Sequence, residues 1–224
     1  ANTGSIGGGF FGIYLGQTNV NDGLTNSGSI SGNLHGIYLT GSTTLSGGLF
    51  NSGSIAGRTA VQIVSGSQLS GGLTNSGLIG GVNYGINVTS NLVGGIHNLN
   101  GGTLTGGVAV TASGVTIGLQ NNTAGTIVGA INGLVNVSNS GLVALQSAYN
   151  GTTYAGSPVA ATITGNFAQA SSGTLQVAVN GVSGSGTTSG NYSQLNVSST
   201  ASFAANSNLS IVMSSGAAVI GGQT

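Results

Sequence analysis

Residues 45–57 read LSGGLFNSGSIAG, and residues 69–81 read LSGGLTNSGLIGG. The two stretches agree at most positions and begin 24 residues apart, so the chain repeats itself. The phrase NSG that they share also begins at Asn26, and a looser copy, NTGSIGG, begins at Asn2. An internal repeat of about 20–50 residues is typical of proteins built from stacked structural units.

Five columns of aliphatic residues keep in phase with this phrase, at steps of 22 to 25 residues. The first column holds Ile6, Ile30, Ile55, Ile79, Leu104 and Ile127, and the second holds Ile13, Ile37, Val61, Ile86 and Val108. The third holds Leu15, Leu39, Ile63, Val88 and Val110, the fourth Val20, Leu45, Leu69, Leu92 and Val115, and the fifth Leu24, Leu49, Leu73, Ile96 and Leu119. We therefore expect equivalent residues of successive copies to stack on one another.

Short segments inside each copy alternate apolar and polar residues with the period of a β-strand, as in GIYLG (12–16) and GIYLTG (36–41). Glycine pairs turn the chain between them, and the glycine content opposes helix. Strands this short cannot bury an apolar face alone, but parallel stacking at ~4.8 Å covers each column with the next. The sequence predicts an all-β fold: a right-handed parallel β-solenoid with about 24 residues and three short strands per coil.

The pattern changes after residue 145. The stretch 147–158 resembles a loop and contains the only proline, Pro158. Alternating segments return over 174–179 and 208–213. We therefore expect regular solenoid coils over residues 1–145 and an irregular C-terminal solenoid or capping segment over residues 146–224.

The repeated asparagines predict a structural column of their own. In a parallel stack, like charges ~4.8 Å apart repel one another, whereas carboxamides both donate and accept hydrogen bonds along the stack. We expect Asn2, Asn26, Asn51 and Asn75 to form an asparagine ladder at one corner. The alternative is that each asparagine only satisfies its own turn.

Two tyrosines are candidate surface-contact residues. Tyr14 and Tyr38 share one outward column, which continues with Gln62 and Asn87. The pair could contact a sugar, and the alternative is ordinary stacking between neighbouring strands.

The near absence of charge excludes several function classes. Arg58 is the only Lys or Arg and Asp22 the only Asp or Glu. We therefore expect no nucleic-acid partner, because phosphate binding needs a basic surface, and no carboxylate pair for glycoside hydrolysis. His35 and His97 fall in variable or outward columns, so neither is assigned a metal or a proton-transfer role.

Other signatures of chemistry are also missing. The chain has no cysteine, and it has no run of 18 apolar residues that would span a membrane as a helix. No nucleotide-binding glycine motif is present. We predict no catalytic residue, no cofactor, no metal site and no membrane insertion for this chain.

Several phrases together resemble autotransporter passenger domains. These are the repeated NSG-x-I phrase, GTLQV (173–177), YSQLNVSSTASF (192–203) and NLSIV (208–212), and the likeness is strongest to the C-terminal segment of that family. The resemblance implies a right-handed β-helix exported to the outer surface of a Gram-negative bacterium, with an autochaperone-like segment that ends the helix and assists its folding. It brings no catalytic residues.

Three functions follow as expectations. The first is a non-enzymatic extracellular structural protein that self-associates through the solenoid ends into a surface or biofilm-matrix fibre, because the sequence enters the repeat at Asn2 without a polar cap. The second is an adhesin-type passenger that binds a cell-surface or glycan ligand on host or neighbouring cells. The third is an ice-binding solenoid, for which Thr40, Ser65, Thr89 and Thr111 would form a hydroxyl column.

Overall fold

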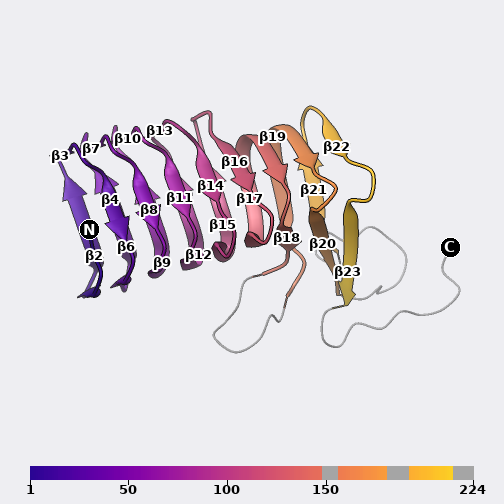
Figure 1. The fold of residues 1–224 in the computed structure, drawn as a ribbon, viewed down its shortest axis with the longest axis horizontal. Coiled ribbons are helices and arrows are strands. Elements are labelled where there is room, and N and C mark those ends of the chain that lie inside the picture. The colour runs from indigo at the N-terminus through magenta and orange to yellow at the C-terminus, as the bar shows by residue number, and fades with distance from the viewer. Residues whose placement is uncertain (148–155, 181–191, 214–224) are drawn as a thin grey trace, which may run out of the picture.

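The protein consists of β-strands stacked in sequence order along one axis (Figure 1). The computed structural model describes residues 1–147, 156–180 and 192–213, and these contain no helix. One sheet holds nineteen of their strands, four short strands form a second sheet, and the pairings between named strands are parallel. The fold is therefore all-β, with a long parallel sheet that curls around a core, an architecture compatible with a β-solenoid.

The first two copies contain four short strands each. These are β1 (Ser5–Gly8), β2 (Phe11–Gly16), β3 (Asn19–Val20) and β4 (Leu24–Asn26), then β5 (Ser29–Gly32), β6 (His35–Thr40), β7 (Thr44–Leu45) and β8 (Leu49–Asn51). In the next two copies the first two strands merge, giving β9 (Ser54–Ile63), β10 (Gln68–Leu69), β11 (Leu73–Asn75), β12 (Leu78–Val88), β13 (Asn91–Leu92) and β14 (Ile96–Asn98).

The same sheet continues to the end of the described chain. Its remaining strands are β15 (Thr103–Ala112), β16 (Gly118–Asn121), β17 (Thr126–Asn139), β18 (Leu142–Leu145) and β19 (Ala160–Gln169). They are followed by β20 (Thr174–Val179), β21 (Gln194–Val197), β22 (Ala201–Phe203) and β23 (Asn208–Met213). Residues 148–155, 181–191 and 214–224, within the expected C-terminal segment, lie outside the described residues.

Equivalent residues of successive copies are direct partners in the sheet. The first predicted column is confirmed from Ile6 through Ile30, Ile55, Ile79, Leu104 and Ile127, and it continues through Val143, Leu175 and Leu209. The fifth is confirmed from Leu24 to Leu119, and the fourth from Val20 to Leu92. Val115, the last expected member of the fourth column, follows β15 and packs partly buried against the core.

The second and third predicted columns are wrong at their last member. Ile86 pairs with Val110, not with Val108, and the third column shifts in the same way. A bulge in β12, with one residue more between Gly81 and Tyr84 than the strand before it, shifts the register by only one residue and does not account for this error of two. A slip of two residues keeps a side chain on the same face of a strand, so the apolar pattern cannot detect it.

The hydroxyl column proposed for ice binding is not formed. Thr111 pairs with Asn87, and the backbone bond from Val64 N to Leu39 O, at 3.0 Å, places Val64 rather than Ser65 next to Thr40. Ser65 instead lies in the turn after β9 with a φ of 56°. The ice-binding alternative therefore loses the array on which it depended.

The aliphatic columns form the core of the stack. Leu49, Ile55, Val61, Ile63 and Leu69 are almost completely excluded from solvent, and a buried aliphatic side chain contributes about 1.5–3 kcal/mol before entropy. Their equivalents in the first copy are only partly buried, because that copy is covered from one side. Neighbouring copies therefore stabilise each other, and none buries its apolar face alone.

Candidate functional site

Asparagine side chains form a continuous hydrogen-bonded column along one corner of the stack. Nδ2 of Asn2 donates to Oδ1 of Asn26 at 2.7 Å, and Asn26 donates to Asn51 at 2.7 Å. Asn51 donates to Asn75 at 2.8 Å. Each amide donates to the copy that follows it and accepts from the copy before, so the column has a single direction.

The same column extends well beyond the four predicted residues. It runs from Asn75 to Asn98 (2.9 Å), Asn98 to Asn121 (2.8 Å), Asn121 to Asn139 (2.8 Å) and Asn139 to Oε1 of Gln169 (3.3 Å). We call the column from Asn2 to Gln169 the amide ladder. All of its members except Asn2 are buried.

Each ladder amide also closes its own turn. Nδ2 of Asn75 donates to the Gly77 carbonyl at 3.0 Å and to the Thr103 carbonyl of the next copy at 3.2 Å. Asn26 and Asn51 repeat this arrangement. The same asparagine side chain thus bonds both to the ladder and to its own turn. Together these bonds satisfy the hydrogen-bonding groups of a carboxamide that water cannot reach.

The rest of the NSG phrase has an equally direct explanation. The serine side chain lies on the outside, as Ser52 and Ser76 show. The glycine is required because copies approach closely there. A Cβ on Gly53 would overlap the carbonyl oxygen of Gly28, and one on Gly77 would overlap that of Gly53. In each NSG phrase the asparagine thus joins the amide ladder, the serine faces outward, and the glycine allows the close approach of the neighbouring copy.

Of the later asparagines in the ladder, only Asn139 carries the NSG phrase in the sequence. Asn98 and Asn121 bond to carbonyls four residues ahead, at Gly102 and Gly125, so their turns hold two extra residues and lack the NSG phrase. Asn139 begins another NSG phrase, but it lies only 18 residues after Asn121. This interval falls outside the repeat of about 24 residues typical of the earlier copies.

The two predicted tyrosines lie in a cluster of rings on β2 and β6. Tyr14 pairs with Tyr38 across the strands, with ring centroids 5.8 Å apart. Tyr38 also stacks on His35 at 4.7 Å and on Phe11 at 5.3 Å. We call Phe11, Tyr14, His35 and Tyr38 the aromatic patch. Its Tyr14 side chain is 56% exposed, so the patch presents a flat, partly apolar surface to solvent.

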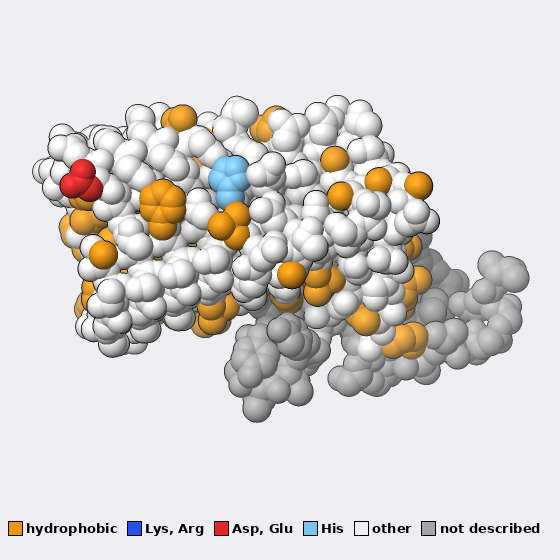
Figure 2. Space-filling model, viewed as in Figure 1, with side chains coloured by type: hydrophobic (Ala, Val, Ile, Leu, Met, Phe, Trp, Pro, Cys, Tyr) orange, Lys and Arg blue, Asp and Glu red, His pale blue; other side chains and the backbone are white. Residues whose placement is uncertain are grey.

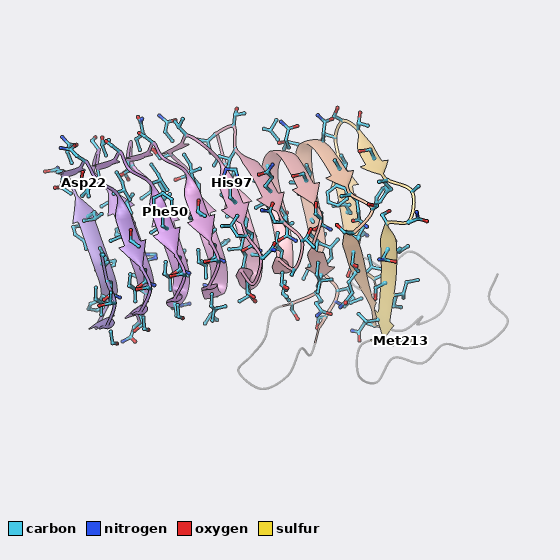
Figure 3. The ribbon with its side chains drawn as sticks, viewed as in Figure 1. Asp22, Phe50, His97 and Met213 are labelled. Carbon is cyan, nitrogen blue, oxygen red and sulfur yellow. The ribbon has the colours of Figure 1, made fainter. Side chains whose placement is uncertain are left out.

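The titratable side chains do not gather. His35 lies in the aromatic patch, where burial lowers its pKa, and its Nδ1 is buried without a hydrogen-bond partner. His97 lies on β14, far along the stack, on the face that also carries Asp22 (Figure 3). Arg58 is exposed on β9. A desolvated imidazole favours its neutral form, so His35 is a poor cation at neutral pH.

Three observations bear on chemistry. Among the residues that the structure describes, no three His, Asp or Glu side chains come close enough to hold a metal ion. No membrane-crossing helix occurs in the same ranges. Comparison with protein-family models, curated proteins and solved structures returned no match. Function therefore has to be argued from the surfaces of this chain alone.

Proposed function

We propose that this chain is a non-enzymatic extracellular structural protein whose copies stack end to end into a surface or matrix fibre. We infer a right-handed β-solenoid with about 24 residues per coil. Ladder partners 24, 25, 24, 23 and 23 residues apart support that coil size. The merged strands β9, β10 and β11 support three strands per coil.

The observation that carries this proposal is the outer edge of the last strands. Among the described residues, β21, β22 and β23 pair with earlier strands on one side only. Their apolar side chains are open to solvent: Leu209 is 66% exposed and Ile211 is 64% exposed, with Phe203 and Met213 also exposed. An open strand edge with an apolar face is a template for pairing with another chain.

The opposite end offers a matching edge. Strands β1, β2 and β3 also pair on one side only, Asn2 alone bridges to the outer side of β4, and the aliphatic residues of these strands are only partly buried. All strands run parallel, so a second copy in the same orientation continues the sheet. Such a contact does not close and leads to filaments.

The surface adds little to oppose association. The chain has only one Lys or Arg and one Asp or Glu, and the face drawn in Figure 2 shows one acidic side chain and one histidine among uncharged polar groups, backbone and scattered apolar side chains. Colloidal repulsion that keeps ordinary proteins apart depends on net charge. The resemblance to passenger domains supports an extracellular location on a Gram-negative bacterium.

The proposal is tested by measuring particle mass against concentration, using light scattering after size exclusion, and by electron microscopy. We expect filaments or concentration-dependent oligomers. Ile211→Lys should shift the protein towards monomer, because it places a charge in the stacking face. Val82→Lys, at a 76%-exposed position on the side of the stack, is the matched control and should associate normally. Monomers of wild type at all concentrations would overturn the proposal.

A second candidate, an adhesin-type passenger, is favoured by the aromatic patch. Exposed, stacked rings are the groups that contact sugars and protein partners. If this function holds, Tyr14→Ser should abolish binding of the purified protein to target cells. Equal cell binding by wild type and by Tyr14→Ser would remove this candidate.

A further inference from the structure

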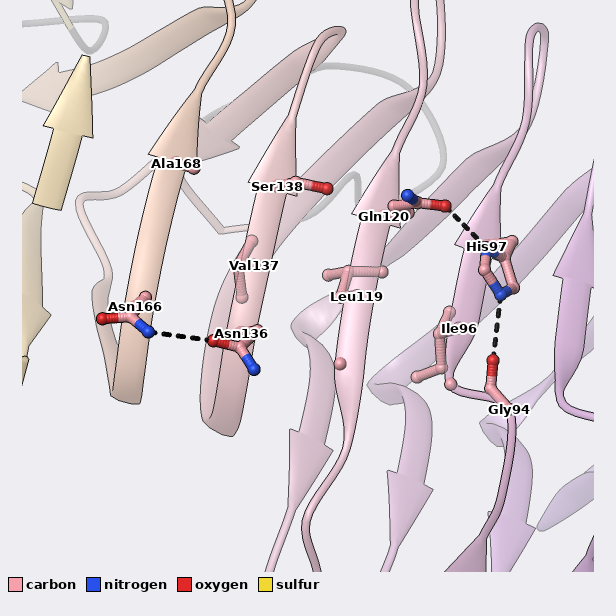
Figure 4. Close-up of a pocket in the computed structure, with 12 residues that line it drawn as sticks. Gly94, Ile96, His97, Leu119, Gln120, Asn136, Val137, Ser138, Asn166 and Ala168 are labelled. Atoms are coloured by element: carbon pink, nitrogen blue, oxygen red, sulfur yellow. Dashed lines mark hydrogen bonds between the residues drawn. The ribbon is translucent and has the colours of Figure 1, made fainter. Parts of the chain in front are cut away.

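A groove of about 420 Å³ lies on the face made by β14, β16, β17 and β19 (Figure 4). Its size is that of a small-molecule site, for which about 300–1,000 Å³ is typical. The lining residues used below are His97, Gly118, Gln120, Asn136, Ser138 and Asn166. Sequence reasoning gave none of them a role, because outward columns do not follow the core pattern.

Polar side chains along the groove are ordered by register and by hydrogen bonds. His97, Gln120 and Ser138 occupy one outward column, and Asn136 and Asn166 occupy a second, two residues earlier on the strands. His97 Nδ1 lies 2.9 Å from Gln120 Oε1, and its Nε2 lies 2.9 Å from the Gly94 carbonyl oxygen.

The second polar column is held in the same way. Asn166 Nδ2 donates to Asn136 Oδ1 at 3.1 Å, and the backbone N–H of Thr200 donates to Asn166 Oδ1 at 3.2 Å. The Asn136 side chain therefore has a fixed oxygen and turns its Nδ2 group away from this bond (Figure 4), whereas the orientation of the Gln120 amide follows from the tautomer of His97. Donors fixed before a ligand arrives bind at lower entropic cost.

Backbone geometry does not require a glycine at residue 118, where the lack of a side chain keeps the groove open. The preceding glycine of this column, Gly95, needs its positive φ of 73°, and a Cβ there would approach the Gly118 carbonyl oxygen to 3.0 Å. Gly118 has no positive φ, and its Cβ would meet the Asn136 carbonyl oxygen only at 3.6 Å, an ordinary contact. A side chain fits at residue 118 and would occupy the groove.

The chemistry of the groove selects against charged ligands. Asp22 and Arg58, the only carboxylate and guanidinium side chains, do not line it. Its lining combines the apolar side chains of Ile96, Leu119, Val137 and Ala168 with carboxamides, a hydroxyl and an imidazole. The polar groups match neutral hydroxyl groups as donors and acceptors, and the apolar ones match the C–H faces of a neutral ligand. An anion would find no cation to offset its desolvation.

The axis of the groove also suits a chain of sugars. Outward residues recur once per strand at ~4.8 Å, close to the length of one pyranose residue in a β-linked chain. Two flat rings share the His97 column, because Phe50 pairs with Thr74 and Thr74 with His97 (Figure 3). Ring faces pack against the apolar faces of sugars. We infer that this groove binds a neutral oligosaccharide lying along the stack, a site separate from the fibre ends and from the aromatic patch.

The test is calorimetric titration of the full chain with cellotetraose, maltotetraose and chitotetraose, and with trigalacturonate as a charged comparison. We expect at least one neutral tetrasaccharide to bind with a Kd on the order of 0.1–1 mM, and trigalacturonate to bind at least about tenfold more weakly. Gly118→Val should weaken the neutral ligand at least about tenfold, and Gln120→Ala should weaken it about threefold or more.

Gly9→Val is the matched control, since a Cβ at Gly9 meets no atom within 4 Å and Gly9 lies outside the groove. This variant should bind as wild type does. The inference is overturned if no neutral tetrasaccharide binds wild type, if trigalacturonate binds as tightly, or if Gly118→Val and Gln120→Ala both bind normally. Failure of filament formation leaves this result unaffected, because binding does not require the stack ends.

Discussion

Substitution of Asn75 tests the amide ladder directly. Asn75 is fully buried: its two Nδ2 hydrogens are shared among three acceptors, Asn98 Oδ1 and the Gly77 and Thr103 carbonyls, and its Oδ1 accepts from Asn51 Nδ2. Alanine removes the equivalent of three hydrogen bonds, each of which is worth about 0.5–1.5 kcal/mol net. It also leaves Asn98 Oδ1 buried without its donor, at a cost of about 1–3 kcal/mol.

We therefore expect Asn75→Ala to lower the free energy of unfolding by roughly 3–7 kcal/mol, a large share of the 5–15 kcal/mol typical of whole domains. The measurement is urea denaturation followed by far-UV circular dichroism, which reports the strands directly. Asn83→Ala, at an exposed position in the β12 bulge, is the control and should change stability by less than about 0.5 kcal/mol.

A double-mutant cycle separates the ladder from the turn. If Asn75 and Asn98 interact through their side chains, the losses from Asn75→Ala and Asn98→Ala should fail to add by about 1 kcal/mol or more. If each asparagine served only its own turn, the two losses would add within about 0.5 kcal/mol. Additive losses, or a cost for Asn75→Ala no greater than for Asn83→Ala, would refute the ladder as a stabilising element.

Three further predictions concern packing and pH. Gly53→Ala should destabilise the protein strongly or prevent folding, because its Cβ overlaps the Gly28 carbonyl, whereas Gly9→Ala should be neutral by the same urea assay. Ile79→Ala, at a fully buried position, should cost about 2–5 kcal/mol in that assay. Because burial lowers the His35 pKa, the folded protein binds a proton less readily than the unfolded chain, so melting temperature should fall as pH drops below about 6.5 and stop falling below the folded-state pKa. His35→Gln should abolish this pH dependence, and a melting temperature that stays constant from neutral pH downwards would contradict it.

Much of the fold could be read from the sequence because the strands stack in parallel and in register. Ile30, Ile55 and Ile79 are one repeat apart in the chain and are direct neighbours in the sheet. A period along the chain therefore becomes a contact in space. The NSG phrase likewise pointed to Asn26 and Asn51, whose side chains the structure joins.

Strand partners could not be predicted from the sequence where the repeat interval varies. Ile86 pairs with Val110 rather than Val108, a two-residue difference that leaves the same face buried and so leaves no trace in the apolar pattern. The 18-residue step to Asn139 hid that ladder member for a related reason. Local insertions change register without changing hydrophobicity.

By itself, the sequence determined which residues face the core and that copies stack, because burial forces the same apolar positions to recur in every copy. Only the tertiary structure decided which surface features the solvent-facing side chains form. The aromatic patch, the open edge of β23 and the groove beside His97 each depend on which outward side chains become neighbours across strands. Core residues can be identified from the sequence because packing restricts them to apolar side chains at regular positions. Solvent-facing positions have no such restriction, so which of their side chains become neighbours is set by register and bulges alone.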